Sequence, residues 1–301
     1  MMKLSISGSV GYIGVGLVFA ILWASASTVT KIGLQQAQPF VISVVRFFMA
    51  SALMLIISHL LMKNPLPKHE EFKKLAIYGL LNITIYLGLY ILAMQEVSAG
   101  LGSLAVAINP VIITLLSGIW DRKKINLQSI SSLLLCTSGV LIAAYPLIKN
   151  SFASPLGILL LFTSMLIYSL GTIYFERNNW QGLPLLTING WQTFFGGVFI
   201  APIAFFTWDA QSNVLDKQFW ITTSWLAIGV SIMAIQCWIF LLKTYGGKSS
   251  YWLFLCPIVG FILSNSIMNE PIGVFTFVGS ALVLFGLYGN IKNRFKAVKT
   301  D

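Results

Sequence analysis

The sequence predicts an all-α integral membrane protein in which ten transmembrane helices form two inverted five-helix repeats. Three observations lead to this fold class. Of the 301 residues, 57% are hydrophobic and only 9% are charged, whereas soluble proteins carry roughly 25% charged residues. Ten apolar stretches are each about 20 residues long, the length that crosses a bilayer core. The first half of the chain also resembles the second half.

The ten expected spans follow one another with short connections. They cover residues 11–30, 40–62, 75–95, 98–120, 128–148, 155–175, 184–208, 219–242, 249–268 and 272–291. Little of the chain remains between them, which leaves no room for a soluble catalytic domain. The expected domains are a first five-helix repeat over residues 1–148, a linker over 149–154, and a second repeat over 155–301 that ends in a basic cytoplasmic tail.

The first two expected spans carry polar side chains at helical spacing. Trp23, Ser27 and Thr30 share one face of the first span. Pro39 opens the second span, and Arg46 follows about 10 Å further along the helix. A charge inside a membrane span indicates a functional site, and an arginine that extends to the nearby membrane surface is the alternative.

The third and fourth spans predict an aromatic face and a bent helix. Asn82, Tyr86 and Tyr90 share one face of the third span, which suits either a wet aromatic cavity or hydrogen bonding within the bundle core. The fourth span is rich in small residues, as is typical of closely packed membrane helices. Pro110 follows Asn109 near its middle, and we expect a bend there because proline removes a helical hydrogen bond.

The second half repeats these features with small changes in spacing. Corresponding residues are Tyr168 and Trp23 at an offset of 145 residues, Gln192 and Arg46 at 146, and Pro257 and Pro110 at 147. Each half contains five spans, an odd number, so the second half must lie upside down relative to the first. In such inverted repeats the substrate binds near the bilayer midplane, between the halves.

The basic residues are divided unevenly between the two sides of the membrane. With ten spans, 15 of them lie on one side, and only Lys31, Lys149 and Lys217 lie on the other. Cytoplasmic loops carry an excess of Lys and Arg, so both termini are expected in the cytoplasm. This distribution explains the net charge of +10 without nucleic-acid binding, and no nucleic-acid partner is expected.

The sequence contains no catalytic constellation. No pair of carboxylates lies inside a span, and neither histidine, His59 or His69, has a cysteine beside it. The three cysteines, Cys136, Cys237 and Cys256, fall inside spans and are expected to be packing residues. We therefore expect no enzyme activity, no cofactor and no metal site.

Several short motifs occur in a characteristic order along nearly the whole chain. They are Leu22-Trp23-Ala24-Ser25 with Lys31, Pro39 with Arg46-Phe47, Ser98-Ala99-Gly100-Leu101, Asn109-Pro110 and Asn269-Glu270-Pro271. The pattern resembles the EamA family of the drug/metabolite transporter superfamily, which are ten-helix carriers of bacterial inner membranes. The family usually has a Gly-Glu pair after its fourth span, where this chain has Trp120-Asp121-Arg122. A counterpart of Glu270 is therefore present only in the second half.

The resemblance implies a secondary transporter that exports amino acids, metabolites or related small molecules across the inner membrane by alternating access. No Asp or Glu lies deep in any span, which disfavours cationic drugs and favours a neutral, zwitterionic or anionic solute. The alternatives are an importer or exchanger of a phosphorylated or nucleotide-like solute, and a non-transport membrane protein. The expected partners are a small-molecule substrate and the lipid bilayer, and the sequence does not specify an oligomeric state.

The candidate functional residues follow from the polar and aromatic positions within the spans. The expected substrate-binding residues are Trp23, Arg46, Tyr86, Tyr90, Asn109, Tyr168 and Gln236. Pro110 and Pro257 are the expected hinges, because they occupy equivalent places in the two halves and each frees a backbone carbonyl one turn earlier.

The expected topology can be tested with single cysteines. In Lys149→Cys and Lys123→Cys variants, the new thiols should react with a membrane-impermeant maleimide from opposite sides of the membrane, because one span separates the two positions. Reaction of both thiols from the same side would contradict the ten-span topology and the inverted repeat.

Overall fold

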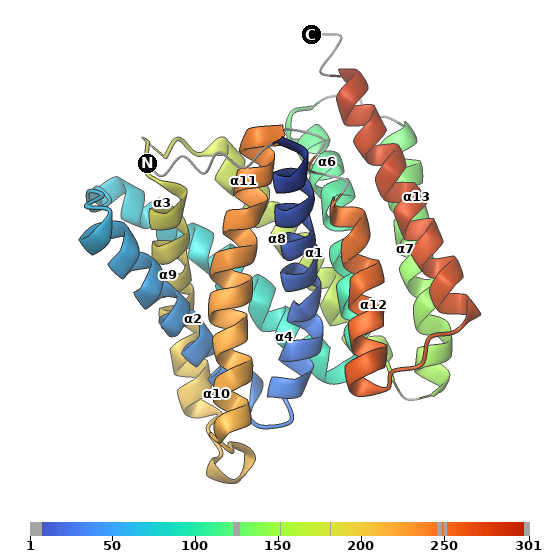
Figure 1. Cartoon of the computed structure of the whole chain (residues 1–301), viewed down its shortest axis with the longest axis horizontal. Helices are drawn as coiled ribbons and strands as arrows, with labels where there is room; N and C mark the ends of the chain where they lie inside the picture. Colours follow the sequence, from blue (N-terminus) through green and yellow to red (C-terminus); the bar gives the residue numbers. More distant parts are fainter. Residues whose placement is uncertain are drawn as a thin grey trace.

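The computed structural model describes residues 8–122, 127–150, 152–180, 182–245, 249 and 252–297. Within these residues the chain is a bundle of helices (Figure 1) without a β-strand, apart from one isolated bridge between Val97 and Ala153. Lys123, Lys124 and Lys248 lie outside the described residues, as does the end of the expected tail.

The helices follow one another with short connections, as the sequence predicts. In chain order they are α1 (Gly8–Gly33), α2 (Pro39–Leu55), η1 (Ile56–Leu61), α3 (His69–Gly79), η2 (Leu80–Ile85), α4 (Tyr86–Glu96), α5 (Ala99–Val106), α6 (Asn109–Trp120), α7 (Leu127–Lys149), α8 (Pro155–Arg177), α9 (Leu185–Phe206), η3 (Ala210–Ser212), α10 (Lys217–Ser224), η4 (Trp225–Ala234), α11 (Ile235–Tyr245), α12 (Leu255–Met268) and α13 (Val274–Ala297).

Most of these helices are suited to a bilayer. Seven helical stretches in the described part of the chain are long and apolar enough to cross a membrane, and Trp252–Met268 and Val274–Gly289 are shorter apolar helices. Helix α9 has 22 residues, but its first half carries Asn189, Trp191 and Gln192 and is less apolar. The protein is thus an all-α multi-pass membrane protein, and the count of ten spans remains a prediction.

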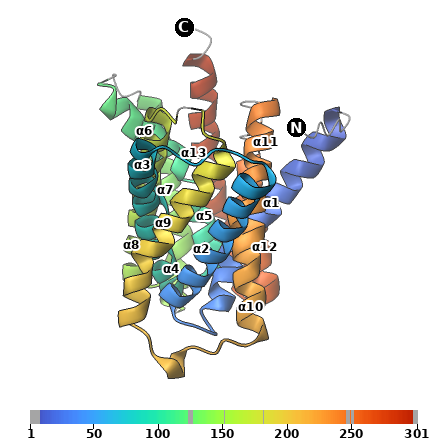
Figure 2. The same ribbon diagram turned by 90° about the vertical axis from the view of Figure 1, so that its left-hand side faces the viewer.

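The two ends of the bundle can be told apart. Helix α1 begins and α13 ends at the same end, which we call the upper end, and the connection 207–216 between α9 and α10 lies at the opposite, lower end (Figures 1 and 2). The junction between α4 and α5 and the turn between α12 and α13 also lie toward the lower end (Figure 1). This assignment locates the mouth of the cavity described below.

Close helix packing depends on glycine at several crossings. Helices α7 and α13 contact each other along much of their length at one edge of the bundle (Figure 1). A Cβ atom on Gly139 of α7 would lie 2.5 Å from the carbonyl oxygen of Gly279 on α13. Helix α12 crosses α5 in a similar way, since a Cβ atom on Gly260 would overlap the side chain of Ser103. Small residues at these contacts allow the backbones to approach.

The two expected hinges lie at helix starts. Helix α5 ends at Val106 and α6 begins at Asn109, so the fourth expected span is broken near Pro110. Pro257 is the third residue of α12 and follows a short 3-10 turn over Trp252–Phe254. Proline at the start of a helix loses no intrahelical hydrogen bond, because the first N–H groups have no partner there. The interruptions are therefore breaks between two helices rather than kinks in one.

Two long helices contain π-helical segments at corresponding places in the two halves. Segment η2 joins α3 to α4, and η4 joins α10 to α11. At the offset of 147 residues, η4 corresponds to residues 78–87, a range that encloses η2. Segments with i→i+5 hydrogen bonds are rare and frequently occur at functional sites. The apolar periodicity of the sequence does not predict them.

The close contact of α7 and α13 leads to a stability prediction. Gly139→Val should destabilise the protein by about 1–3 kcal/mol, because the new side chain would overlap the backbone of Gly279. The measurement is the thermal unfolding midpoint of the purified protein in detergent. Gly14→Ala is the matched control, since a Cβ atom there meets nothing within 4 Å. Equal midpoints for the two variants would contradict the packing described for Gly139.

Candidate functional site

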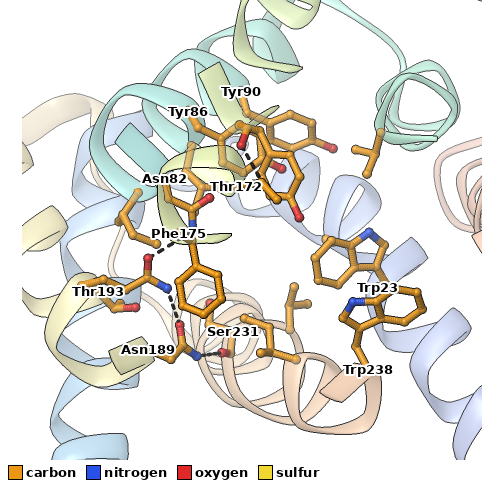
Figure 3. A pocket seen from close by; sticks show the side chains of 18 of the residues that line it. Trp23, Asn82, Tyr86, Tyr90, Thr172, Phe175, Asn189, Thr193, Ser231 and Trp238 are labelled. Carbon is orange, nitrogen blue, oxygen red and sulfur yellow. Dashed lines mark hydrogen bonds between the residues drawn. The ribbon is translucent and has the colours of Figure 1, made fainter. Parts of the chain in front are cut away.

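A cavity of about 450 Å³ lies inside the bundle (Figure 3). Its walls come from α1, α2, η2, α4 and α5 in the first half of the chain, and from α8, α9, η4 and α11 in the second half, with Tyr78 of α3 in addition. The cavity thus lies between the two expected repeats. A volume of this size suits a small metabolite.

The structure brings five of the seven expected substrate-binding residues together in the wall of this cavity. They are Trp23, Arg46, Tyr86, Tyr90 and Tyr168. Asn109 and Gln236 are not part of the wall. Asn109 is buried at the start of α6, and Gln236 is half-buried at the start of α11, where Ile235, Trp238 and Ile239 face the cavity instead.

Aromatic rings form much of the wall. The ring centroid of Tyr86 lies 4.9 Å from that of Tyr168 and 6.2 Å from that of Tyr90. Trp23 and Trp238 lie together on the other side of the cavity (Figure 3). Both pack against the buried ring of Phe19, at centroid distances of 5.7 and 5.0 Å. The Tyr86 and Tyr90 positions follow from the i, i+4 spacing on α4, which is a regular helix.

A chain of amide side chains crosses from the first half to the second. The Nδ2 group of Asn82 donates to Oε1 of Gln192 (3.2 Å), Nε2 of Gln192 donates to Oδ1 of Asn189 (2.8 Å), and Nδ2 of Asn189 donates to the Ser231 carbonyl oxygen (3.1 Å). Figure 3 shows these bonds as dashed lines between Asn82 and Ser231. Because a backbone carbonyl can only accept, the direction of every bond in the chain is set from the Ser231 end.

Arg46 is the cation deep in the cavity wall. Its Nε and one terminal nitrogen both donate to the hydroxyl oxygen of Ser231, each at 3.1 Å, and Tyr86 and Tyr90 line the same cavity. Within the described part of the chain, no carboxylate forms an ion pair with Arg46. A guanidinium beside phenol and serine hydroxyls supplies several hydrogen-bond donors, which is the chemistry that binds a carboxylate or another oxyanion.

The cavity reaches the upper end of the bundle. Glu176 near the end of α8 and Lys243 near the end of α11 belong to its wall, and both are exposed. Toward the lower end, the wall consists of buried residues such as Ser27 and Thr30 of α1. The described residues therefore show a cavity that is accessible from the upper end and closed at the lower end.

Ser231 and Trp238 belong to the wall although the sequence analysis did not select them. Both lie in or just after η4, where the i→i+5 pattern changes which residues share a face. Asn189 and Gln192 carry a clearer signal, because two amides three residues apart in an apolar span must find partners on one helix face. Among the described residues, no cluster of side chains could hold a metal ion.

Comparison with solved structures and with curated proteins places the chain among membrane transporters. A crystal structure that covers 94% of this chain and 96% of its own chain has a TM-score of 0.66 at 15% sequence identity, which shows a shared fold. An uncharacterized transporter of Archaeoglobus fulgidus is 23% identical, over 90% of this chain and 95% of its own length.

Two bacterial relatives give the same result. The uncharacterized transporter YvbV of Bacillus subtilis is 24% identical over 88% of this chain and 86% of its own length. The uncharacterized inner membrane transporter YedA of Escherichia coli is 21% identical over 90% and 88%. The model of the EamA-like transporter family matches residues 10–145 and again residues 155–291. These two matches cover most of the chain, and the chain therefore belongs to the EamA-like transporter family.

Proposed function

We propose that this transporter exports a small metabolite that carries a carboxylate, such as an amino acid or a related zwitterionic or anionic solute. The observation that carries the proposal is Arg46, a cation in the cavity wall that pairs with the Ser231 hydroxyl and with no carboxylate among the described residues. A substrate carboxylate would accept two parallel bonds from the guanidinium and neutralise its charge.

The chemistry of the wall supports this substrate class over the alternatives. Arg46 is the basic residue deep in the cavity, and Lys243 lies at the exposed mouth. One cation suits a single carboxylate better than the multiple charges of a phosphorylated or nucleotide-like solute. The rings of Trp23, Tyr86 and Tyr168 would pack against an apolar or aromatic part of the same molecule.

Three features support an inverted repeat and alternating access. The family model matches the chain twice, and η2 and η4 lie at corresponding places in the two matches. Arg122 and Asn269, which are 147 residues apart, both have positive φ angles, 52° and 55°, although neither is a glycine. Pro110 and Pro257, near the starts of α6 and α12, are also 147 residues apart, and in this proposal they are the points at which each half bends during the cycle.

The charges at the two ends support export as the direction of transport. The described loops at the upper end carry most of the basic residues, so the positive-inside rule assigns this end, and both termini, to the cytoplasm. The mouth of the cavity would then load substrate from the cytoplasm. The inner membrane is the proposed location, as the name of the Escherichia coli relative states for that protein.

Transport by purified protein tests the role of Arg46. In proteoliposomes supplied with labelled amino acids and related carboxylates, Arg46→Gln should lower the initial rate about tenfold to a hundredfold for the substrate that the wild type moves, because a charged hydrogen bond is lost. Arg46→Lys should also be impaired, since lysine keeps the charge and loses the planar fork.

The control for this experiment is Lys217→Gln, which removes one positive charge from an exposed position at the start of α10. Its transport rate should equal that of the wild type. If both Arg46 variants also transport at the wild-type rate, Arg46 is not the anion partner and the extension of its side chain to the membrane surface is favoured.

A further inference from the structure

A buried carboxylate of the second half binds the start of a helix of the first half. Glu270 lies in the turn between α12 and α13 and is only 4% exposed. Its Oε1 accepts the backbone N–H of Ala99 at 2.7 Å, and its Oε2 accepts the N–H of Gly100 at 3.1 Å. These are the first two residues of α5, so a negative charge lies at the positive end of that helix.

The turn that carries Glu270 is held in one geometry by its own helix. Helix α12 ends at Met268, and the next residue, Asn269, adopts a left-handed conformation with φ of 55°. Asn265 donates from Nδ2 to the carbonyl oxygen of Glu270 at 2.8 Å. The carboxylate is thus aimed at α5 by residues of α12, and the two helices also pack through Gly260 and Ser103.

A cation lies on the other side of the same junction. The ammonium group of Lys31, at the end of α1, donates to the carbonyl oxygen of Met94 in the last turn of α4 and to that of Val97, the residue directly after α4. Its charge is attracted to Glu270 and to Glu96. The junction of α4 and α5 therefore has a cation at the negative helix end and an anion at the positive helix end.

Helix α5 does not need Glu270 as an ordinary cap. Ser98 already caps it from within the first half, because its hydroxyl oxygen accepts the N–H of Leu101 at 3.1 Å. Glu270 adds a second cap to α5 from the other half of the chain. Helix α5 also contributes Ser103 and Val106 to the cavity wall. This bond can form only while α12 and α5 are close together.

We propose that Glu270 and Lys31 form a latch that keeps the lower end of the cavity closed. The inference rests on the proposed transport function and identifies residues that position the two halves during the cycle. Opening the lower end would separate α12 from α5 and break both bonds of Glu270. The latch therefore favours the state in which the cavity is accessible from the upper end.

The upper end has no equivalent latch among the described residues. There Asp121 binds Arg177 of α8, but both side chains are about one-third exposed, at 33% and 36%. Exposed ion pairs stabilise a structure much less than buried charged hydrogen bonds. The residue that corresponds to Glu270 at the offset of 147 is Lys123, whose charge has the opposite sign. This asymmetry agrees with a cavity that is closed at the lower end.

Cysteine accessibility tests the latch without knowledge of the substrate. Thr30→Cys places a thiol in the cavity wall near the lower end, in a background with Cys237→Ala because Cys136 and Cys256 are buried. A membrane-impermeant maleimide is added from the side of the lower end. Glu270→Gln should raise the labelling rate about tenfold to a hundredfold, since it removes the charge and one of the two acceptor oxygens.

Asp209→Asn is the matched control, because it removes a carboxylate charge at the same end from an exposed residue whose side chain binds Gln211 and Ser212 rather than α5. Its labelling rate should equal that of the parent. If Glu270→Gln does not insert into the membrane, Glu270→Asp decides the question. Aspartate keeps the charge but is one methylene shorter, so its labelling rate should lie above the parent value.

Wild-type labelling rates in every Glu270 variant that inserts would overturn the latch. A different measurement tests the proposed transport function: wild-type transport rates in both Arg46 variants would contradict it. The two ideas are therefore tested separately.

Discussion

Backbone hydrogen bonding at the junction of α4 and α5 is the constraint on which the cavity depends. A bilayer core offers no water, so every helix end among other helices needs a partner from the protein. Val97 and Ser98 are buried at this junction, and the helix ends beside them are satisfied by Lys31, Ser98 and Glu270. These bonds fix the start and the direction of α5. They thereby also fix the positions of Ser103 and Val106, the residues that α5 contributes to the cavity wall.

The same constraint accounts for the polar wall of the cavity. The carbonyl oxygen of Ser231 lies within η4 and accepts from Asn189, and the Thr84 hydroxyl of η2 donates to the carbonyl oxygen of Gly196 at 3.1 Å. The π-helical segments η2 and η4 are thus both bound to α9 by side-chain hydrogen bonds. Polar groups of the cavity wall, such as Arg46 and Ser231, also join the first half of the chain to the second.

Regular helices could be predicted from the sequence, and the irregular segments could not. Composition and apolar length predict the helical bundle, and the i, i+4 spacing of Tyr86 and Tyr90 places both rings in the cavity wall because α4 is regular. Gln236 follows the π-helical η4, and Asn109 begins a new helix after a break. A count of 3.6 residues per turn from the start of each span therefore does not predict which way either side chain faces. The contact of Glu270 with Ala99 joins residues 171 positions apart. No local pattern reveals such a contact.

The unequal lengths of η2 and η4 bear on how the two halves diverged. The offset between the halves is 146 residues at Arg46 and Gln192 and 147 at Pro110 and Pro257, so one residue was gained or lost between these points. In between lie the π-helical segments η1 and η2, with six residues each, in the first half and η4, with ten, in the second. In a regular α-helix, one inserted residue would rotate everything beyond it by about 100°. A π-helical segment absorbs such an insertion locally, and the helix that carries η4 could therefore grow longer in evolution without turning Trp238 away from the cavity.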